Sequence, residues 1–297
     1  MGKFILNDSD VVGIVANDAG AANLILGWVK NNKKLKYFFC VSGPAKKIFQ
    51  DANLLQKCLG LDTLIGLCDV MVTGTSYRSV LEHKARYKGK LSNIKSIGVI
   101  DHWVNYKRRF IRNGHEVLPD LIWVFDDCAE KMAKRIFEKV PIEKQKNYYL
   151  EDIVSKIKSI EKKENDLTYK ILYILEPIRG KGAKNEKPFE FKVLDFFASK
   201  INHLKSSDSI EIRLRTHPSE IKSKYSEWIK NQELFVSLSF GSGLEEDIAW
   251  ADVVVGYESF ALVIASACDK RCLSSKLPNE ENSRLMIKNL EYLRDLN

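Results

Sequence analysis

The feature that most restricts the fold of this chain is an alternation of strand and helix patterns that runs through the sequence twice. Short apolar runs at 11–16 and 70–73 end in small or polar residues, and segments with helical spacing follow them. The pattern restarts at 170–175 and continues to 271–274. Apolar strands that alternate with helices are typical of parallel sheets covered on both faces. The sequence therefore predicts an α/β fold of two Rossmann-like domains, each a parallel sheet with helices on both faces.

A segment of different character separates the two runs. Residues 141–166 are rich in Lys and Glu, and Ile153, Val154, Ile157 and Ile160 recur at helical spacing, which predicts an amphipathic helix. A chain of 297 residues has room for two domains of roughly 150 residues each. We predict, in chain order, a Rossmann-like domain (1–142), a helical linker (143–168), a second Rossmann-like domain (169–279) and a C-terminal helix (280–297) that packs back towards the first domain.

Net charge narrows the classes of partner. The chain has 47 Lys and Arg against 39 Asp and Glu, a net charge of +8, which favours acidic small molecules or an anionic membrane surface. The basic residues are dispersed, whereas a nucleic-acid footprint clusters them, so no nucleic-acid partner is expected.

Cysteine usage and hydropathy indicate the compartment. The six cysteines have no CxxC spacing and lie mostly in apolar segments, which favours reduced thiols in a cytoplasmic protein. No apolar run approaches the ~20 residues of a membrane span, and the first residues lack a signal-peptide pattern. We expect a cytoplasmic protein, with peripheral contact at the inner face of the membrane as an option.

A basic strand that ends in His-Pro is the most informative stretch. Apolar residues alternate with polar ones over 210–215, which indicates a strand, and Pro218 ends it because proline cannot extend a β-ladder. In open α/β sheets, ligands bind at the carboxyl edge. Basic and hydroxyl groups at that edge suit a phosphate. The donor-binding candidates of this stretch are Arg215, Thr216, His217 and Pro218, with Arg213 beside them. The alternative is that His217 is a packed histidine.

Three more turns of the second half are candidates for donor binding. Glu258 and Ser259 end the strand at 252–255, where a carboxylate and a helix N-terminus suit hydroxyls and phosphate, although Ser259 as a simple helix cap is the alternative. The loop at 239–243, which contains Ser242, is a candidate turn whose backbone N–H groups bind the base or the phosphate. The 176–182 loop is either a ligand-binding loop or a solvated basic loop, and its candidates are Glu176, Arg179 and Lys181.

Polar residues also follow two strands of the first half, at 17–23 and at 101–110. Asp18 is the candidate base that deprotonates a hydroxyl, and the alternative is that it caps the next helix. Asp101 and His102 are rival bases, and the stretch is otherwise a packed loop with a basic surface. Trp103 or Tyr106 would stack on a sugar face. The acceptor-binding candidates are Asn17, Asn23, Asp101, His102, Trp103 and Tyr106.

The two-domain layout resembles the GT-B architecture of glycosyltransferases and the related UDP-sugar 2-epimerases. His217-Pro218 is similar to the His-Pro motif of bacterial sialyltransferases and Kdo transferases. That resemblance implies that His217 binds the phosphate of a CMP-sugar and assists the leaving group, and that an acid of the first half, here Asp18, is the base. The turn that contains Glu258 and Ser259 resembles the late GT-B turn that binds ribose or sugar hydroxyls, but it has fewer glycines than in the epimerases.

No metal or other cofactor is expected. Asp126-Asp127 lacks the spacer of a DxD motif, Asp8-Ser9-Asp10 precedes the first strand, and neither HExxH nor CxxC occurs. Together, the GT-B and His-Pro resemblances imply a metal-independent, inverting glycosyltransferase that moves a sugar, by preference a CMP-activated acidic sugar of the sialic, pseudaminic or Kdo type, to a surface polysaccharide or glycoconjugate. The alternatives are a UDP-sugar epimerase or hydrolase, and a non-catalytic component of a polysaccharide assembly machine.

Overall fold

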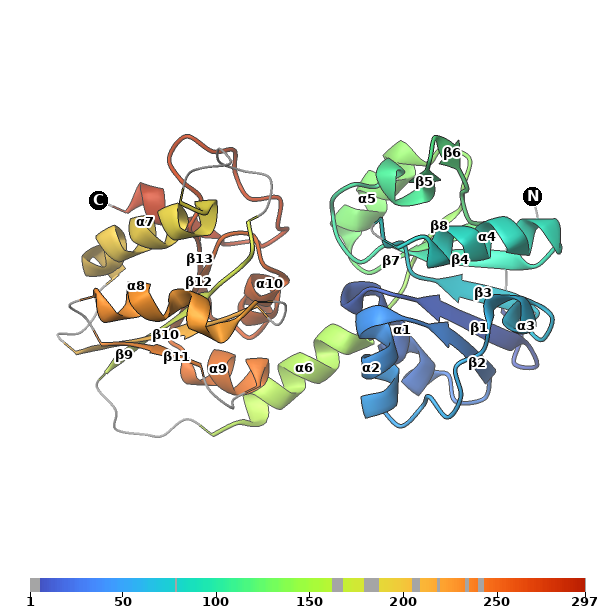
Figure 1. The fold of residues 1–297 in the computed structure, drawn as a ribbon, viewed down its shortest axis with the longest axis horizontal. Coiled ribbons are helices and arrows are strands. Elements are labelled where there is room, and N and C mark those ends of the chain that lie inside the picture. The colour runs from blue at the N-terminus through green and yellow to red at the C-terminus, as the bar shows by residue number, and fades with distance from the viewer. Residues whose placement is uncertain are drawn as a thin grey trace. The chain divides into compact units, whose positions relative to one another are not determined.

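The computed structural model describes residues 6–77, 79–161, 168–178, 187–204, 209–217, 220–232, 235–239 and 243–296. The chain divides into two compact units, unit 1 (Met1–Glu151) and unit 2 (Asp152–Asn297). Each unit contains a six-stranded, all-parallel sheet with helices around it (Figure 1). This confirms the predicted fold class.

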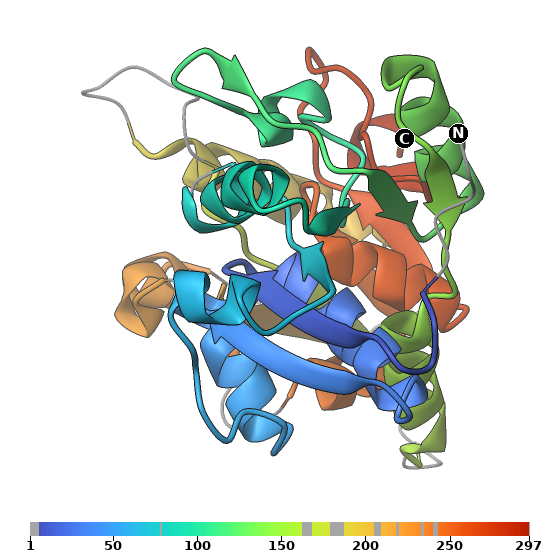
Figure 2. The same ribbon diagram turned by 90° about the vertical axis from the view of Figure 1, so that its right-hand side faces the viewer.

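The sheet of unit 1 is built from strands that follow the short apolar runs of the sequence. In spatial order the strands are β2 (Lys36–Val41), β1 (Val11–Ala16), β3 (Val70–Thr73), β4 (Lys95–Val99), β7 (Leu121–Val124) and β8 (Ile142–Lys144). The helices are α1 (Ala19–Asn31), α2 (Gly43–Asp51), α3 (Leu61–Ile65), α4 (Leu81–Leu91) and α5 (Asp127–Ile136). A short 3₁₀ helix, η1 (Lys107–Phe110), leads into the hairpin of β5 (Ile111–Arg112) and β6 (His115–Glu116). These elements can also be followed in Figure 2.

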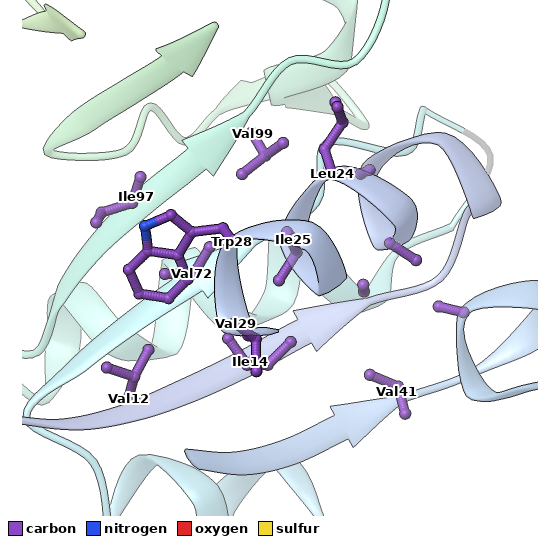
Figure 3. Packing of buried hydrophobic residues seen from close by; sticks show 14 of the residues in the cluster. Val12, Ile14, Leu24, Ile25, Trp28, Val29, Val41, Val72, Ile97 and Val99 are labelled. Atoms are coloured by element: carbon purple, nitrogen blue, oxygen red, sulfur yellow. The ribbon is translucent and has the colours of Figure 1, made fainter. Parts of the chain in front are cut away.

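Both faces of this sheet are buried, which explains why its strands are apolar without alternation. Val12 and Ile14 of β1 belong to the core cluster under α1 and α2, whereas Val15 belongs to the cluster under α3 and α4. Figure 3 shows Trp28 of α1 lying close to Ile97 and above the strands of the sheet. Alternate residues of one strand therefore anchor helices on opposite faces.

The sheet of unit 2 has a different strand order. In spatial order its strands are β11 (Val236–Leu238), β10 (Ile210–Arg215), β9 (Tyr169–Ile174), β12 (Val253–Gly256), β13 (Arg271–Ser274) and β14 (Glu291–Tyr292). The helices of this unit are α7 (Phe189–Leu204), η2 (Lys222–Tyr225), α8 (Ser226–Lys230), α9 (Leu244–Trp250), α10 (Phe260–Ala267) and η3 (Leu293–Asp295), and α6 (Tyr148–Ser159) begins in unit 1 and ends in unit 2. Its main core packs α7 on the sheet, with the rings of Phe197 and Tyr173 4.5 Å apart.

The amphipathic linker segment forms α6, which buries Ile153 and Ile157 as its spacing predicts. The boundary between the two units falls within this helix, after Glu151. Among the described residues, no helix combines the length and the apolar character that a membrane crossing requires.

The predicted C-terminal helix at 280–297 is wrong. The described part of this segment forms β14 and η3 instead, and Leu293 is fully buried in the core of unit 2. The Arg294 guanidinium donates to the carbonyls of Leu277 (3.3 Å) and Glu280 (2.7 Å). These bonds fold the segment back onto its own unit, so its apolar residues serve the unit 2 sheet and not a helix.

Candidate functional site

The strand order of unit 2 defines one candidate site. Numbered within the unit, the order is 3-2-1-4-5-6, so the chain changes direction across the sheet between β9 and β12. Ligands of such sheets bind in the crevice beyond the carboxyl ends of the strands at this switch point. Glu176 follows β9 there, and Tyr257, Glu258 and Ser259 follow β12.

Glu176 joins the ends of the two central strands. Its carboxylate accepts the backbone N–H groups of Tyr257 (3.0 Å) and Glu258 (2.9 Å). Burial raises the pKa of Glu176 to about 7, the two N–H groups oppose this rise, and the charge of Glu258 adds to it. Glu176 therefore exchanges its proton near neutral pH at the point where a ligand is expected.

Glu258 is held by two cations. It accepts from the backbone N–H (2.7 Å) and Nη2 (2.8 Å) of Arg284, and Lys276 Nζ lies 3.4 Å away. Although burial opposes ionisation, the bonds from Arg284 and the charge of Lys276 keep the pKa of Glu258 below its ordinary value. Arg284 Nε also donates to Oε1 (3.3 Å), so donors crowd Oε1, and Oε2, which accepts from Arg284 Nη2, is the oxygen that could still accept from a ligand hydroxyl. Ser259 Oγ accepts from Ala261 N (3.2 Å), so the capping interpretation of Ser259 is confirmed.

The two arginines of β10 are less available than we expected. Asp247 of α9 is fully buried and binds both, Arg213 at 3.3 Å and Arg215 at 2.5 Å. The Arg213 guanidinium also stacks 3.9 Å from the centre of the Trp250 ring. Asp247 partly neutralises both charges, which weakens the expectation that the two arginines bind an anionic ligand.

His217 lies beyond the end of β10 with an exposed side chain. The alternative of a packed core histidine is therefore wrong. Its carbonyl accepts from Glu220 N (2.9 Å). Thr216, between His217 and the strand, is half-buried. The other donor-site candidates of this half, Arg179, Lys181, Pro218 and Ser242, lie outside the described residues.

Unit 1 has a second switch point. Its strand order, 2-1-3-4-5-6 when the hairpin is left out, reverses between β1 and β3. Asn17 and Asp18 follow β1 at this point. The Asn17 side chain donates to Asp18 Oδ1 (2.8 Å) and accepts from Ser42 Oγ (2.8 Å). Asp18 occupies the N-cap position of α1 but its side chain makes no capping bond, so the capping alternative for this carboxylate is wrong.

Sequence reasoning missed Glu82, which lies behind this turn. Glu82 is fully buried in the first turn of α4, and its Oε1 accepts from Asn17 N (2.9 Å). Burial raises the pKa of Glu82, and the negative charge of Asp18 adds to this rise. Within the described part of the chain, Oε2 of Glu82 has no hydrogen-bond partner. The turn therefore has a second acid close to the candidate base.

Arg86, one turn after Glu82 on α4, is also fully buried. It donates to Thr73 Oγ1 (3.1 Å) and to the Gly74 carbonyl (3.0 Å), and so fixes the end of β3. Burial lowers the pKa of Arg86 to about 10. The sequence signal for these two residues is an acid and an arginine spaced i, i+4 in the helix that follows β3.

Asp101 also belongs to this edge of unit 1. Asp101 forms a 2.6 Å ion pair with the buried Arg109. Its Oδ2 packs against Gly20 so closely that a Cβ atom added to this glycine would lie only 2.0 Å from the oxygen. The carboxylate thus rests on the first turn of α1, where negative charge is favoured. Asn23 is half-buried in α1, and His102 is half-buried after β4.

Trp103 and Tyr106 are structural residues. Trp103 is 8% exposed and its indole N–H donates to Asp126 (3.0 Å), while Tyr106 is 4% exposed and stacks on Phe137. The expectation that either ring stacks on a sugar is wrong, because protein atoms already cover both rings.

The acidic pair Asp126-Asp127 has roles in helix α5. Asp126 caps the helix by accepting from Ala129 N (2.7 Å), and Asp127 pairs with Lys144. Elsewhere in the described chain, no three His, Cys, Asp or Glu side chains gather in a way that suits a metal ion.

Comparisons with known proteins bear on the fold. No protein-family model and no curated protein sequence matches this chain. Among solved structures, a putative UDP-N-acetylglucosamine 2-epimerase from Listeria monocytogenes matches with a TM-score of 0.62 and 11% identity over 89% of this chain and 78% of that chain. The UDP-GlcNAc 2-epimerase from Neisseria meningitidis, bound to UDP-GlcNAc, matches with a TM-score of 0.58 and 10% identity over 89% and 82%. Acinetobacter baumannii MurG matches with a TM-score of 0.51 and 11% identity over 91% and 79%.

The chain has the GT-B fold. At these identities the similarity shows the fold and nothing finer, because one fold hosts many activities.

Proposed function

We propose that this GT-B protein is a glycosyltransferase that uses a nucleotide-activated sugar. The observation that carries the proposal is the exposed His217 at the carboxyl edge of unit 2, one strand away from Glu176 at the switch point. In this proposal unit 2 binds the nucleotide, and Asp18 of unit 1 activates the acceptor.

On the donor side, His217 acts on the phosphate. An imidazole N–H donates to phosphate oxygens and stabilises the charge that develops as the nucleotide leaves. Glu176 and Glu258 bind ribose or sugar hydroxyls. Because its pKa is about 7, Glu176 can donate as well as accept near neutral pH.

On the acceptor side, Asp18 is the general base. The Asn17 amide fixes Oδ1 of Asp18, and no bond to Oδ2 occurs among the described residues, so Oδ2 is placed to take a proton. The acceptor oxygen then attacks the anomeric carbon, the bond from that carbon to the phosphate oxygen breaks, and the acceptor proton passes to Asp18. A single displacement of this kind inverts the configuration at the anomeric carbon.

The preferred donor remains a CMP-activated acidic sugar, on the strength of the His-Pro resemblance. The arginine pair of β10 adds little support to this preference, because Asp247 already binds both side chains. The acceptor is a surface polysaccharide or glycoconjugate, and the reaction needs no metal.

The proposal is tested by incubating the protein with CMP-sugars and UDP-sugars and a panel of glycan acceptors, and measuring nucleotide release with and without EDTA. We expect one nucleotide class to turn over regardless of EDTA, and Asp18→Asn or His217→Ala to lower kcat by roughly 100-fold or more. His203→Ala and Asp8→Asn, at exposed positions outside both switch points, are matched controls. Equal activity in all four variants would refute the assignment.

A UDP-sugar epimerase is the second candidate. It needs several acids in one place, and Glu82, Asp18 and Asp101 supply them at the edge of unit 1. An epimerase would convert a UDP-sugar without any acceptor, and its product would carry deuterium when the reaction runs in D₂O. Nucleotide release that depends on an acceptor favours the transferase instead.

A further inference from the structure

Helix α4 exposes a row of large hydrophobic side chains. Val80, directly before the helix, is 66% exposed, Tyr87 is 53% exposed and Leu91 is 72% exposed. With Lys84 they recur at i, i+4, i+7 and i+11, which places them along one stripe of the helix. The opposite side of α4 is packed and buries Glu82, Ala85, Arg86 and Gly89. The helix therefore has a satisfied inner face and an apolar outer stripe.

The side chains that flank this stripe are positively charged. Lys84 and Lys90 are exposed, and Lys88, about one-third exposed, pairs with Asp62 of α3. The only acid of α4, Glu82, lies on the buried side. We call Val80, Tyr87 and Leu91 with Lys84, Lys88 and Lys90 the α4 patch.

Single exposed hydrophobic residues are ordinary on folded proteins. Three of them along one stripe of a helix, flanked by lysines, form a patch of the kind that marks an interaction site. Three side chains are too few for a stable protein interface, which buries roughly 1,000 Å² or more. They suit an anionic bilayer, where apolar side chains enter the headgroup boundary and lysines bind lipid phosphates.

We propose that the α4 patch docks the protein on an anionic membrane surface. Tyr87 and Leu91 enter the interface, and Lys84 and Lys90 contact the headgroups. The inference is independent of the proposed reaction, because it rests on the outer stripe of α4 and not on either switch point.

The test is co-sedimentation of the full-length protein with vesicles of phosphatidylcholine alone or of equal parts phosphatidylcholine and phosphatidylglycerol. We expect binding only to the vesicles with phosphatidylglycerol, and less binding as salt rises. The double variant Tyr87→Ser with Leu91→Ser, and separately Lys84→Glu with Lys90→Glu, should each weaken binding by roughly tenfold or more.

Matched controls come from exposed residues elsewhere. Ile221 and Phe235 of unit 2 are 76% and 68% exposed, and Ile221→Ser with Phe235→Ser should leave vesicle binding unchanged. Lys30→Glu with Lys33→Glu is the control for charge on unit 1. Thermal melts and far-UV circular dichroism spectra equal to wild type would show that the α4 variants are folded.

Three results would overturn the proposal. The first is no binding of wild type to anionic vesicles, and the second is equal binding by the α4 variants. The third is a dimer in solution that the Tyr87→Ser and Leu91→Ser changes dissociate, since the stripe would then contact a second copy of the chain.

Discussion

Asp247 is a buried side chain that pairs with both arginines of β10. Its buried carboxylate binds Arg213 and Arg215, which lie on the same face of β10, two residues apart. Removing Asp247 would take a buried anion from both arginines, although Arg213 would keep Glu211 (3.6 Å) and the Trp250 ring as neighbours.

Asp247→Ala is therefore expected to lower the free energy of unfolding by about 2–4 kcal/mol, a value reduced from the fully buried case because each arginine is about one-quarter exposed. Urea denaturation measures the change. Asp252→Ala, near the start of β12, is not part of this cluster and is a useful comparison. A loss below the error of the measurement would show that the two arginines are not held by this residue.

Glu82 predicts how stability depends on pH. Burial raises its pKa, so the folded chain holds this proton more tightly than the unfolded chain does. Its contribution favours folding below the unfolded pKa of about 4.3 and is lost as pH rises through the higher folded pKa. Glu82→Gln keeps an acceptor for Asn17 N and cannot ionise.

We expect the stability of Glu82→Gln relative to wild type to increase as pH rises from about 4 towards 8. Denaturation curves at a series of pH values measure it, with Glu116→Gln at an exposed position as the control. If the difference in the free energy of unfolding between Glu82→Gln and wild type stays constant over the whole pH range, the burial of an ionisable Glu82 is contradicted.

Among the elements, α1 owes its position to a glycine in its interior. A Cβ on Gly27 would lie 2.9 Å from the backbone N of Tyr149 and 3.2 Å from Tyr148 Cβ, at the start of α6. Backbone atoms cannot move aside as a flexible side chain can, so only glycine allows this approach.

Two effects predict opposite changes in the free energy of unfolding for Gly27→Ala. Helix propensity alone predicts that alanine stabilises α1 by about 0.5–1 kcal/mol. The packing against α6 predicts a loss of about 1–3 kcal/mol instead. Gly66→Ala is the control, because its Cβ would meet nothing closer than 3.7 Å. A more stable Gly27→Ala protein would contradict the close packing of the two helices.

Leu293 tests whether the C-terminal segment packs in the core of unit 2. Leu293 is fully buried in the core of unit 2, whereas an end helix on the other unit would leave that core unchanged. Leu293→Ala is expected to cost about 2–5 kcal/mol in the free energy of unfolding, and Leu91→Ala, at a 72% exposed position, close to nothing. Similar small losses in both variants would favour the original helix prediction.

These elements also show what the sequence can and cannot predict. Long apolar strands such as β1 and β9 are visible because both of their faces are buried. The short β8 and β14 were missed, since two or three partly exposed residues carry no readable period. His217 and Asp18 could be predicted as site residues because each follows the end of a predicted strand. The burial of Glu82 could not be predicted, because it depends on how α4 packs. Likewise, Asp247 lies 32 residues after its partner Arg215, beyond any local pattern.

The whole molecule consists of two α/β units, each with its own core and its own switch point. In unit 1 the switch point gathers acids around Asn17 and Asp18. In unit 2 it presents Glu176 and Glu258, and His217 lies at the end of the neighbouring strand β10. This division supports the assignment of acceptor activation to unit 1 and of nucleotide binding to unit 2.

Nucleotide binding by unit 2 is the claim on which the functional account rests, and isothermal titration of the full-length protein with CMP and with UDP tests it most directly. The account predicts that at least one of them binds, that His217→Ala weakens this binding roughly tenfold or more, and that His203→Ala does not change it. If neither nucleotide binds at millimolar concentration, or if His217→Ala binds as tightly as wild type, the account is contradicted.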